Sequence, residues 1–208
     1  DHGYVPLSLL QDRRIDYAIA ADISPGSLAK AEILMRQHHV EHCMETRLGS
    51  GLSVLSPGEA NTVILAGMGG LLIRDILEEG EAVARSASTL VLQPMTAQEE
   101  LRRWLVSHGY GITGEDLVRE ERRIYEILIA VPGREAPEPD REIYYDIGWK
   151  LVESGHPLLE EFIGNKIRNL EEIIAKLEAA DTAAAKERQA ELEERLRQVK
   201  EVFRCHIR

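Results

Sequence analysis

The residues of this chain best suited to hold a flat ligand against the backbone form one glycine-rich turn, Ala66-Gly67-Met68-Gly69-Gly70. The turn follows the apolar run at residues 62–65 and opens onto a helical pattern that starts at Leu71. Glycine permits a positive φ and close approach of a ligand, and strand-to-helix turns are where open α/β sheets bind ligands. The turn therefore indicates either ligand contact or tight packing of a helix on a sheet, and one such motif does not separate the two.

Two other strand ends offer groups of the same kind. Asp22 lies at the end of the strand pattern at residues 17–23, where its carboxylate can accept two hydrogen bonds from a ribose diol or cap the helix that follows. Gly49, Ser50 and Gly51 follow the next strand pattern and form either a backbone site or a simple loop. Because the carboxyl ends of parallel strands share one sheet edge, we expect the three turns to meet there.

Other groups give weaker signals. His38, His39 and His42 lie near the end of a predicted helix without the spacing of a metal site, so we favour a solvated face and expect no metal. Cys43 and Cys205 show no CxxC spacing and are expected to be reduced thiols. The sequence has no GxxxxGK[ST] motif, which argues against a phosphate-cradling P-loop.

Strand patterns alternate with amphipathic helical patterns through the first two thirds of the chain. We expect strands at residues 17–23, 44–48, 62–66, 89–93 and 124–131, and helices at residues 5–13, 25–38, 71–85 and 97–108. This alternation predicts an α/β fold with a mostly parallel sheet covered on both faces. Two consecutive strands near residue 120, with no helix between them, suggest an antiparallel hairpin at one sheet edge.

Local signals support the helix starts. Ser24 before Pro25 is typical of an N-cap with proline in the first turn, and Thr96 with Glu99 resembles a capping box. The sequence as given opens with a polar turn at Asp1, whereas a doubly wound sheet normally opens with a strand that becomes central. We therefore expect the first strand to lie upstream of these residues.

The C-terminal part is predicted to be helical. Residues 132–140 form a polar, proline-rich linker, and the apolar side chains beyond it follow two 4-3 seams: Ile163, Ile167, Leu170, Ile174 and Leu177, then Leu192, Leu196, Val199 and Phe203. Two narrow seams predict an antiparallel coiled-coil hairpin or, equally, a dimerisation device, so a weak homodimer is possible. We expect one domain over residues 1–146 and a second over residues 147–208.

Charge and length limit the function classes. The chain has 208 residues and a formal net charge of −11, which argues against non-specific coating of nucleic acid. Residues 147–208 carry 11 basic and 12 acidic side chains, so this part repels a polyanion least. No apolar run approaches the ~20 residues of a membrane span, and the first residues lack a signal-peptide pattern, so we expect a soluble, cytoplasmic protein that binds no membrane.

Four motifs together resemble the TrmK family of bacterial tRNA (adenine(22)-N1)-methyltransferases: Asp1-His2-Gly3-Tyr4-Val5-Pro6, the glycine-rich turn, Leu92-Gln93-Pro94 and Tyr125-Glu126-Ile127-Leu128. The resemblance covers essentially the whole chain. It implies a Rossmann-like class I methyltransferase domain with a C-terminal helical hairpin, S-adenosyl-L-methionine as cofactor and tRNA as partner. Ser50 departs from a family GDGL turn and Met95 from a family QPN sequence.

The resemblance also implies roles for individual residues. The expected cofactor contacts are Asp1, His2, Gly3, Asp22, Ile23, Gly49, Ser50, Gly51, Ala66, Gly67, Met68 and Gly69. The expected catalytic group is Tyr4, Asp1 and Met68. The expected tRNA contacts are Tyr4, Gln93 and Pro94. By their charge alone, further basic residues are either phosphate contacts or ordinary surface charges beside acidic neighbours: Arg102, Arg103, Arg122, Arg123, Lys166 and Arg168.

The implied chemistry needs positioning more than activation. Adenine N1 is a lone pair that can attack a sulfonium methyl without prior deprotonation, and a target inside folded tRNA must first be flipped out. Tyr4 is either the platform for the base or a partly buried tyrosine that packs the first helix, and Asp1 or His2 could take up a proton afterwards. Two alternatives stay open: a methyltransferase of this fold acting on another substrate, and a degenerate RNA-binding scaffold.

Overall fold

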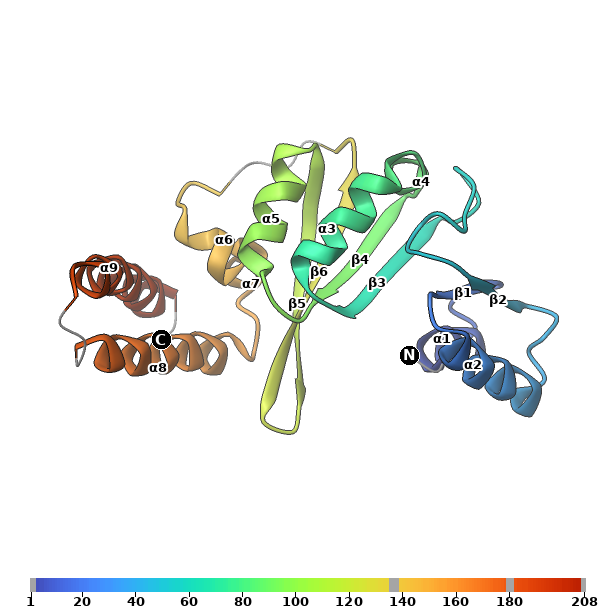
Figure 1. The fold of residues 1–208 in the computed structure, drawn as a ribbon, viewed down its shortest axis with the longest axis horizontal. Coiled ribbons are helices and arrows are strands. Elements are labelled where there is room, and N and C mark those ends of the chain that lie inside the picture. The colour runs from blue at the N-terminus through green and yellow to red at the C-terminus, as the bar shows by residue number, and fades with distance from the viewer. Residues whose placement is uncertain (1–2, 135–138, 179–181, 207–208) are drawn as a thin grey trace. The chain divides into compact units, whose positions relative to one another are not determined.

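The computed structural model describes residues 3–134, 139–178 and 182–206 (Figure 1). These residues form two compact parts. The first comprises the described residues up to 61 together with residues 75–87, and the second comprises residues 62–74 and the described residues from 88 onward.

The first part is a small α/β unit. Its elements are α1 (Tyr4–Gln11), β1 (Ala18–Asp22), α2 (Pro25–His38), β2 (Met44–Leu48) and α4 (Glu81–Ser86). Strands β1 and β2 are parallel, with Ala18 opposite Met44 and Asp22 opposite Leu48. Their inner side chains pack with Met35 of α2. The parallel pairing places the ends of β1 and β2, and the turns that follow them, at one edge.

The second part is built on a four-stranded sheet. Its strands are β3 (Thr62–Met68), β4 (Thr89–Pro94), β5 (Tyr110–Glu120) and β6 (Arg123–Pro132), in the order β3-β4-β6-β5. Only β3 and β4 are parallel, so the prediction of a mostly parallel sheet is wrong. The two-residue turn between β5 and β6 forces an antiparallel pair, as predicted, and β6, rather than β5, lies next to β4 and is antiparallel to it as well.

Helix boundaries follow the sequence signals in one case and depart from them in two. Ser24 caps α2 by accepting a hydrogen bond from the backbone N–H of Ser27, as predicted. The helix predicted at residues 71–85 is two helices, α3 (Gly70–Glu79) and α4, because the chain breaks at Gly80, where a Cβ would lie 2.5 Å from Leu52 Cβ. The capping box is wrong: Ala97, in the left-handed region, precedes α5 (Gln98–Ser107) without a side-chain cap.

Four helices complete the second part: α6 (Ile143–Ile147), α7 (Trp149–Ser154), α8 (Leu159–Glu178) and α9 (Ala183–His206). The predicted C-terminal helix pair is confirmed, with α8 and α9 side by side (Figure 1). Helices α6 and α7 were not predicted. They belong to a core in which Leu117 of β5 packs with Ile163 of α8 and Val199 of α9. Among the described residues, no helix is both long and apolar enough to cross a membrane.

A buried charge cluster joins α5 to the hairpin β5–β6. The Arg102 side chain is fully buried, and it donates to Glu115 Oε1 and to Glu126 Oε2, both at 2.6 Å. It also donates to the carbonyl of Tyr145 at 3.0 Å. Gly148, at φ 90°, packs so closely on this cluster that a Cβ would lie 2.8 Å from Glu115 Oε1. The cluster therefore fixes the α6–α7 corner against the sheet.

A second, half-buried network ties the helix pair to the same corner. Asp146 accepts hydrogen bonds from Lys166 Nζ of α8 at 2.8 Å and from Arg195 Nε of α9 at 3.0 Å. Arg195 also pairs with Glu99 at the start of α5. Burial alone would raise the pKa of Asp146, but the two cations outweigh it and hold the pKa below its ordinary value. The network makes α8 and α9 depend on the charge state of one carboxyl.

Replacing Arg102 by Met should lower the free energy of unfolding by about 3–5 kcal/mol, because Glu115 and Glu126 would stay buried without a counter-charge. Equilibrium urea unfolding measures this loss. Arg103→Met is the matched control: one residue along the same helix, it removes two partly exposed ion pairs, with Glu99 and Glu142, and should cost no more than about 1–2 kcal/mol. Equal losses for the two variants would contradict the assignment of the cluster as the main tie.

Replacing Asp146 by Asn should lower Tm by about 2–4 °C at pH 7. A carboxyl whose pKa is lower in the folded than in the unfolded state stabilises the fold above the unfolded-state pKa of about 3.9, and loses that contribution as the pH falls through the folded-state value. The difference from the wild-type chain should therefore shrink below pH 4. Thermal unfolding across pH tests this, with the exposed Asp140→Asn as control, and a difference that persists at low pH would contradict it.

Candidate functional site

The glycine-rich turn begins as a bulge at the end of β3. The pairing of β3 with β4 shifts between Ala66 and Met68, so Gly67 is an extra residue in the ladder. Gly67 has φ 76°, and no atom lies within 4 Å of the position of a Cβ. Glycine is required here by the backbone conformation rather than by crowding. The turn thus exposes main chain beside open space, as a ligand-contacting backbone must.

Hydrogen bonds hold this turn to the loop after β4. The N–H of Met95 donates to the carbonyl of Met68 at 2.8 Å, and the N–H of Gly70 donates to the carbonyl of Thr96 at 2.7 Å. A Cβ on Gly70 would lie only 2.4 Å from the carbonyl oxygen of Ala97, so this second glycine is required for packing. The packing interpretation of the motif is therefore confirmed at Gly70, and ligand contact at Gly67 stays a prediction.

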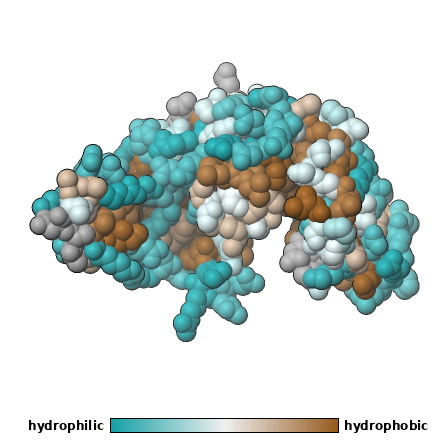
Figure 2. All heavy atoms as spheres, in the orientation of Figure 1, coloured by the Kyte–Doolittle hydropathy of each residue, from teal (hydrophilic) through white to brown (hydrophobic). Residues whose placement is uncertain are grey.

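The segments on either side of the turn carry exposed apolar side chains. Ile64 of β3, Leu71 and Leu72 of α3, and Met95 are between 40% and 52% exposed. Hydrophobic surface is visible around β3 and α3 in Figure 2. Pro94, at the end of β4, is buried. A flat apolar group can contact this surface while its polar edge meets the backbone.

Asp22 lies at the end of β1, half-buried. One carboxylate oxygen, Oδ1, accepts the N–H of Ser24 at 2.7 Å, and the Asp22 carbonyl accepts the N–H of Gly49 at 3.1 Å. Among the described residues, no group donates a hydrogen bond to Oδ2. The first oxygen therefore orders the entry to α2, and the second is available to a ligand. Ile23, next in the chain, is 72% exposed.

The glycines after β2 are explained by packing. A Cβ on Gly49 would lie 2.3 Å from Val54 Cγ1, and one on Gly51, at φ 52°, would lie 2.8 Å from Ile76 Cγ2. The carbonyl of Ser50 accepts hydrogen bonds from the N–H and the hydroxyl of Ser53. This turn is ordered by its own hydrogen bonds and by packing on Val54 and Ile76, and the Ser50 side chain in it is exposed.

The N-terminal motif is described only in part, because Asp1 and His2 lie outside the described residues. Gly3 precedes α1 at φ 79°, and its Cα packs against α2 so that a Cβ would lie 3.0 Å from Ala31 Cβ. Tyr4 is 62% exposed. Its ring is therefore accessible, as a stacking platform requires, rather than packed under the first helix.

The basic residues predicted to face tRNA differ in availability. The prediction for Arg102 is wrong, because its guanidinium is buried and saturated by two carboxylates and a carbonyl. Arg103 pairs with Glu99 and Glu142, and Lys166 pairs with Asp146. No signal in the sequence separates a buried arginine beside two strand glutamates from a surface one.

Three other predicted cations are exposed. Arg168 contacts Asn165 on its own helix, and Arg122 and Arg123 lie at the tip of the β5–β6 hairpin. These side chains can reach a polyanion without breaking a buried interaction. The neighbouring Glu120 and Glu121 reduce the positive charge at the tip.

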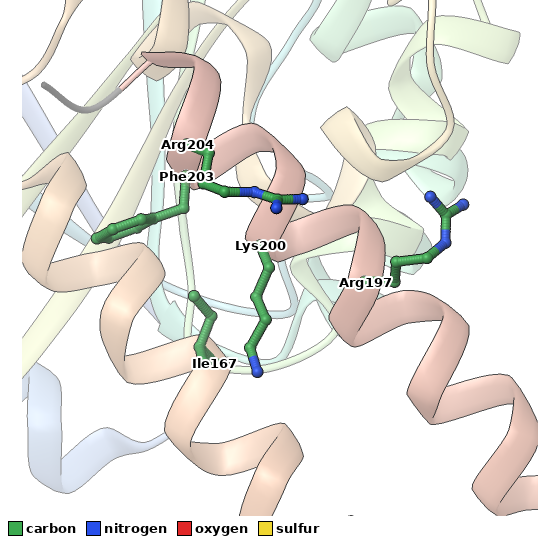
Figure 3. A pocket seen from close by; sticks show the side chains of 5 residues that line it. All are labelled: Ile167, Arg197, Lys200, Phe203 and Arg204. Atoms are coloured by element: carbon green, nitrogen blue, oxygen red, sulfur yellow. The ribbon is translucent and has the colours of Figure 1, made fainter.

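A groove between α8 and α9 holds cations that the sequence analysis missed (Figure 3). Its volume is about 350 Å³, and its lining is apolar and basic: Ile167, Arg197, Lys200, Phe203 and Arg204. Lys200 pairs with Glu171 and Arg197 with Glu194, both as exposed pairs. The sequence does carry a signal for this groove, because Phe203 of the predicted apolar seam has Lys200 three residues before it and Arg204 directly after it.

The glycine-rich turn, Gln93 and the groove belong to the second compact part, whereas Tyr4, Asp22 and residues 49–51 belong to the first. Within the first part, β1 and β2 bring Asp22 next to Gly49. Within the second, β3 and β4 bring Gly67 next to Gln93. The meeting of all three turns stays a prediction.

Comparison with known proteins gives consistent matches. The family model for TrmK, tRNA (adenine(22)-N(1))-methyltransferase, matches residues 1–201. The tRNA (adenine(22)-N(1))-methyltransferase of Bacillus subtilis (strain 168) is 29% identical over 213 residues, covering 98% of this chain and 87% of that protein. The crystal structure of the B. subtilis m1A22 methyltransferase TrmK aligns with a TM-score of 0.86 at 28% identity, covering 98% of this chain and 88% of that one.

Two streptococcal structures agree. A Streptococcus agalactiae protein of the NADB-Rossmann superfamily has a TM-score of 0.86 and 30% identity, with 98% of this chain and 87% of that chain covered. A Streptococcus pneumoniae protein solved in complex with S-adenosyl-L-methionine has a TM-score of 0.84 and 28% identity, with 98% and 88% covered. The fold is therefore that of a Rossmann-like methyltransferase with a C-terminal helix pair. The chain belongs to the TrmK family of tRNA (adenine(22)-N(1))-methyltransferases.

Proposed function

We propose that this methyltransferase binds S-adenosyl-L-methionine with residues that follow β1, β2 and β3 in the sequence, and that it methylates N1 of adenine 22 in tRNA. The observation that carries the proposal is the bulged turn at Gly67, an exposed backbone beside open space in a chain of this family. The S. pneumoniae relative binds the same cofactor. The residues present fit it: Asp22 Oδ2 is available for a ribose hydroxyl, and Ile23 offers apolar surface next to it.

The chemistry asks for positioning. When bound, S-adenosyl-L-methionine supplies an electrophilic methyl group on its sulfonium, and the lone pair of adenine N1 forms the new N–C bond as the S–C bond breaks. The Tyr4 ring is exposed and can stack on the flipped adenine. Met68 and the carbonyls of the turn can meet its apolar face and its amino group. Proton loss from the cationic product to water needs no side chain, although Asp1 or His2 could assist.

We propose that the chain has two functional domains: a catalytic domain over residues 1–146 and a helical domain over residues 147–208 that binds tRNA. The groove between α8 and α9 supports this assignment, because its basic rim and the ring of Phe203 suit a phosphate and an unpaired base (Figure 3). The ion pairs at its rim are exposed and cost little to exchange for phosphate. The exposed Ile173 of α8 also supports weak self-association through the same helices.

Asp22→Asn should raise KM for S-adenosyl-L-methionine about 10–100-fold, because a hydrogen bond to a charged acceptor is lost while the Asn oxygen still accepts the Ser24 N–H. Methyl transfer from labelled cofactor to unmodified bacterial tRNA, followed by mapping of the modified base, measures this. Asp16→Asn, an exposed aspartate of the same compact part, is the control.

The same assay decides between the proposed function and its alternatives. Methylation at N1 of adenine 22 by the wild-type chain, weakened by Asp22→Asn alone, is the expected result. Cofactor binding without any methylated tRNA would favour another substrate. Absence of cofactor binding would favour a degenerate scaffold.

Arg204→Gln should weaken tRNA binding about three- to tenfold at low salt and reduce the slope of log K against log salt by about one, because one phosphate contact is lost. Filter binding or fluorescence anisotropy across a salt series measures both. Arg188→Gln, at the other end of α9, is the matched control and should leave the slope unchanged. An unchanged slope for Arg204→Gln would contradict the groove as a tRNA contact.

A further inference from the structure

The bulge at Gly67 leaves one backbone donor without a ladder partner. In the parallel pair β3–β4, Ala66 lies opposite Gln93 and Met68 lies opposite Pro94, so Gly67 has no residue across from it. Pro94 has no N–H to offer to this part of the ladder. An exposed glycine with a positive φ and no side-chain packing needs another contact to keep one conformation.

The side chain of Gln93 provides that contact. Its Oε1 accepts the N–H of Gly67 at 2.8 Å, and its Nε2 donates to Met95 Sδ at 3.3 Å. Both the oxygen and the nitrogen of the Gln93 amide thus form hydrogen bonds with groups of the protein itself. This differs from the sequence-based expectation, which placed Gln93 among the residues that contact tRNA.

We infer that Gln93 is a positioning residue for methyl transfer, which fixes the backbone of Gly67 and Met68 at the reacting centre. The inference rests on the proposed function of this turn. Met68 and Gly70 are already held by backbone hydrogen bonds to Met95 and Thr96, so Gly67 is the member of the turn that depends on a side chain. Small displacements of groups that orient a substrate lower the rate strongly, whereas they change substrate affinity less.

Two variants separate the acceptor from the rest of the side chain. Gln93→Leu keeps the size and removes the acceptor, and it should lower kcat about tenfold with KM for tRNA and cofactor little changed. Gln93→Glu keeps an oxygen acceptor for Gly67 and removes the amide donor, and it should stay within about threefold of the wild-type kcat. Gln98→Leu is the matched control, because Gln98, at the start of α5, donates to the carbonyl of Pro94 and, among the described residues, makes no hydrogen bond to the turn.

Amide hydrogen exchange of Gly67, followed by NMR, gives a readout that does not need activity. Exchange should be faster in Gln93→Leu and close to wild type in Gln93→Glu and Gln98→Leu. An increase in KM for tRNA with unchanged kcat in Gln93→Leu would overturn the inference in favour of a direct tRNA contact. Equal loss of kcat in the Glu and Leu variants would also overturn it, because the donor would then matter.

Failure of the inference differs from failure of the proposed function. A wild-type chain that methylates no tRNA would refute the proposed function. Gly67 exchange that is unchanged in Gln93→Leu would refute the inference by itself, whatever the activity. A drop in Tm for Gln93→Leu with a matching loss in every kinetic parameter would assign Gln93 a merely structural role and so overturn it too.

Discussion

A buried guanidinium must have its charge and its N–H groups matched by partners that are equally buried, since an unmatched charge there is strongly destabilising. In this chain Arg102 of α5 finds those partners on β5, on β6 and at the end of α6. This one side chain thereby ties together the β5–β6 hairpin, α5 and the α6–α7 corner that leads to α8. The half-exposed network around Asp146 adds α8 and α9 to the same frame.

This frame connects the proposed reacting centre to the proposed tRNA grip. Helix α5 follows directly on the loop whose backbone holds Met68 and Gly70. Its first turn also carries Glu99, which pairs with Arg195 of α9. A tRNA that displaces α8 and α9 would therefore also pull on α5, the helix that follows the loop bound to the glycine-rich turn.

Sequence patterns were most informative where local chemistry decides the structure. The Ser24 cap, the C-terminal helix pair and the glycine-rich turn after β3 all follow from residue type and spacing. The mixed sheet depended on which strand β6 would join, and the break at Gly80 depended on a contact with Leu52 that lies 28 residues earlier. The prediction of Arg102 as a tRNA contact was wrong for the same reason. The sequence shows that the side chain is charged, whereas its burial depends on segments far along the chain.

The shared partners of Arg102 also favour one order of assembly for the second part, since contacts between neighbouring segments tend to form before contacts between distant ones. The β5–β6 hairpin closes through a two-residue turn and brings Glu115 and Glu126 together early, as two carboxylates that repel one another until a cation arrives. Arg102 relieves that repulsion when α5 docks, and only the docked guanidinium can then recruit the Tyr145 carbonyl. In this order α8 and α9 would pack last, on the surface that β5, α6 and α7 form together.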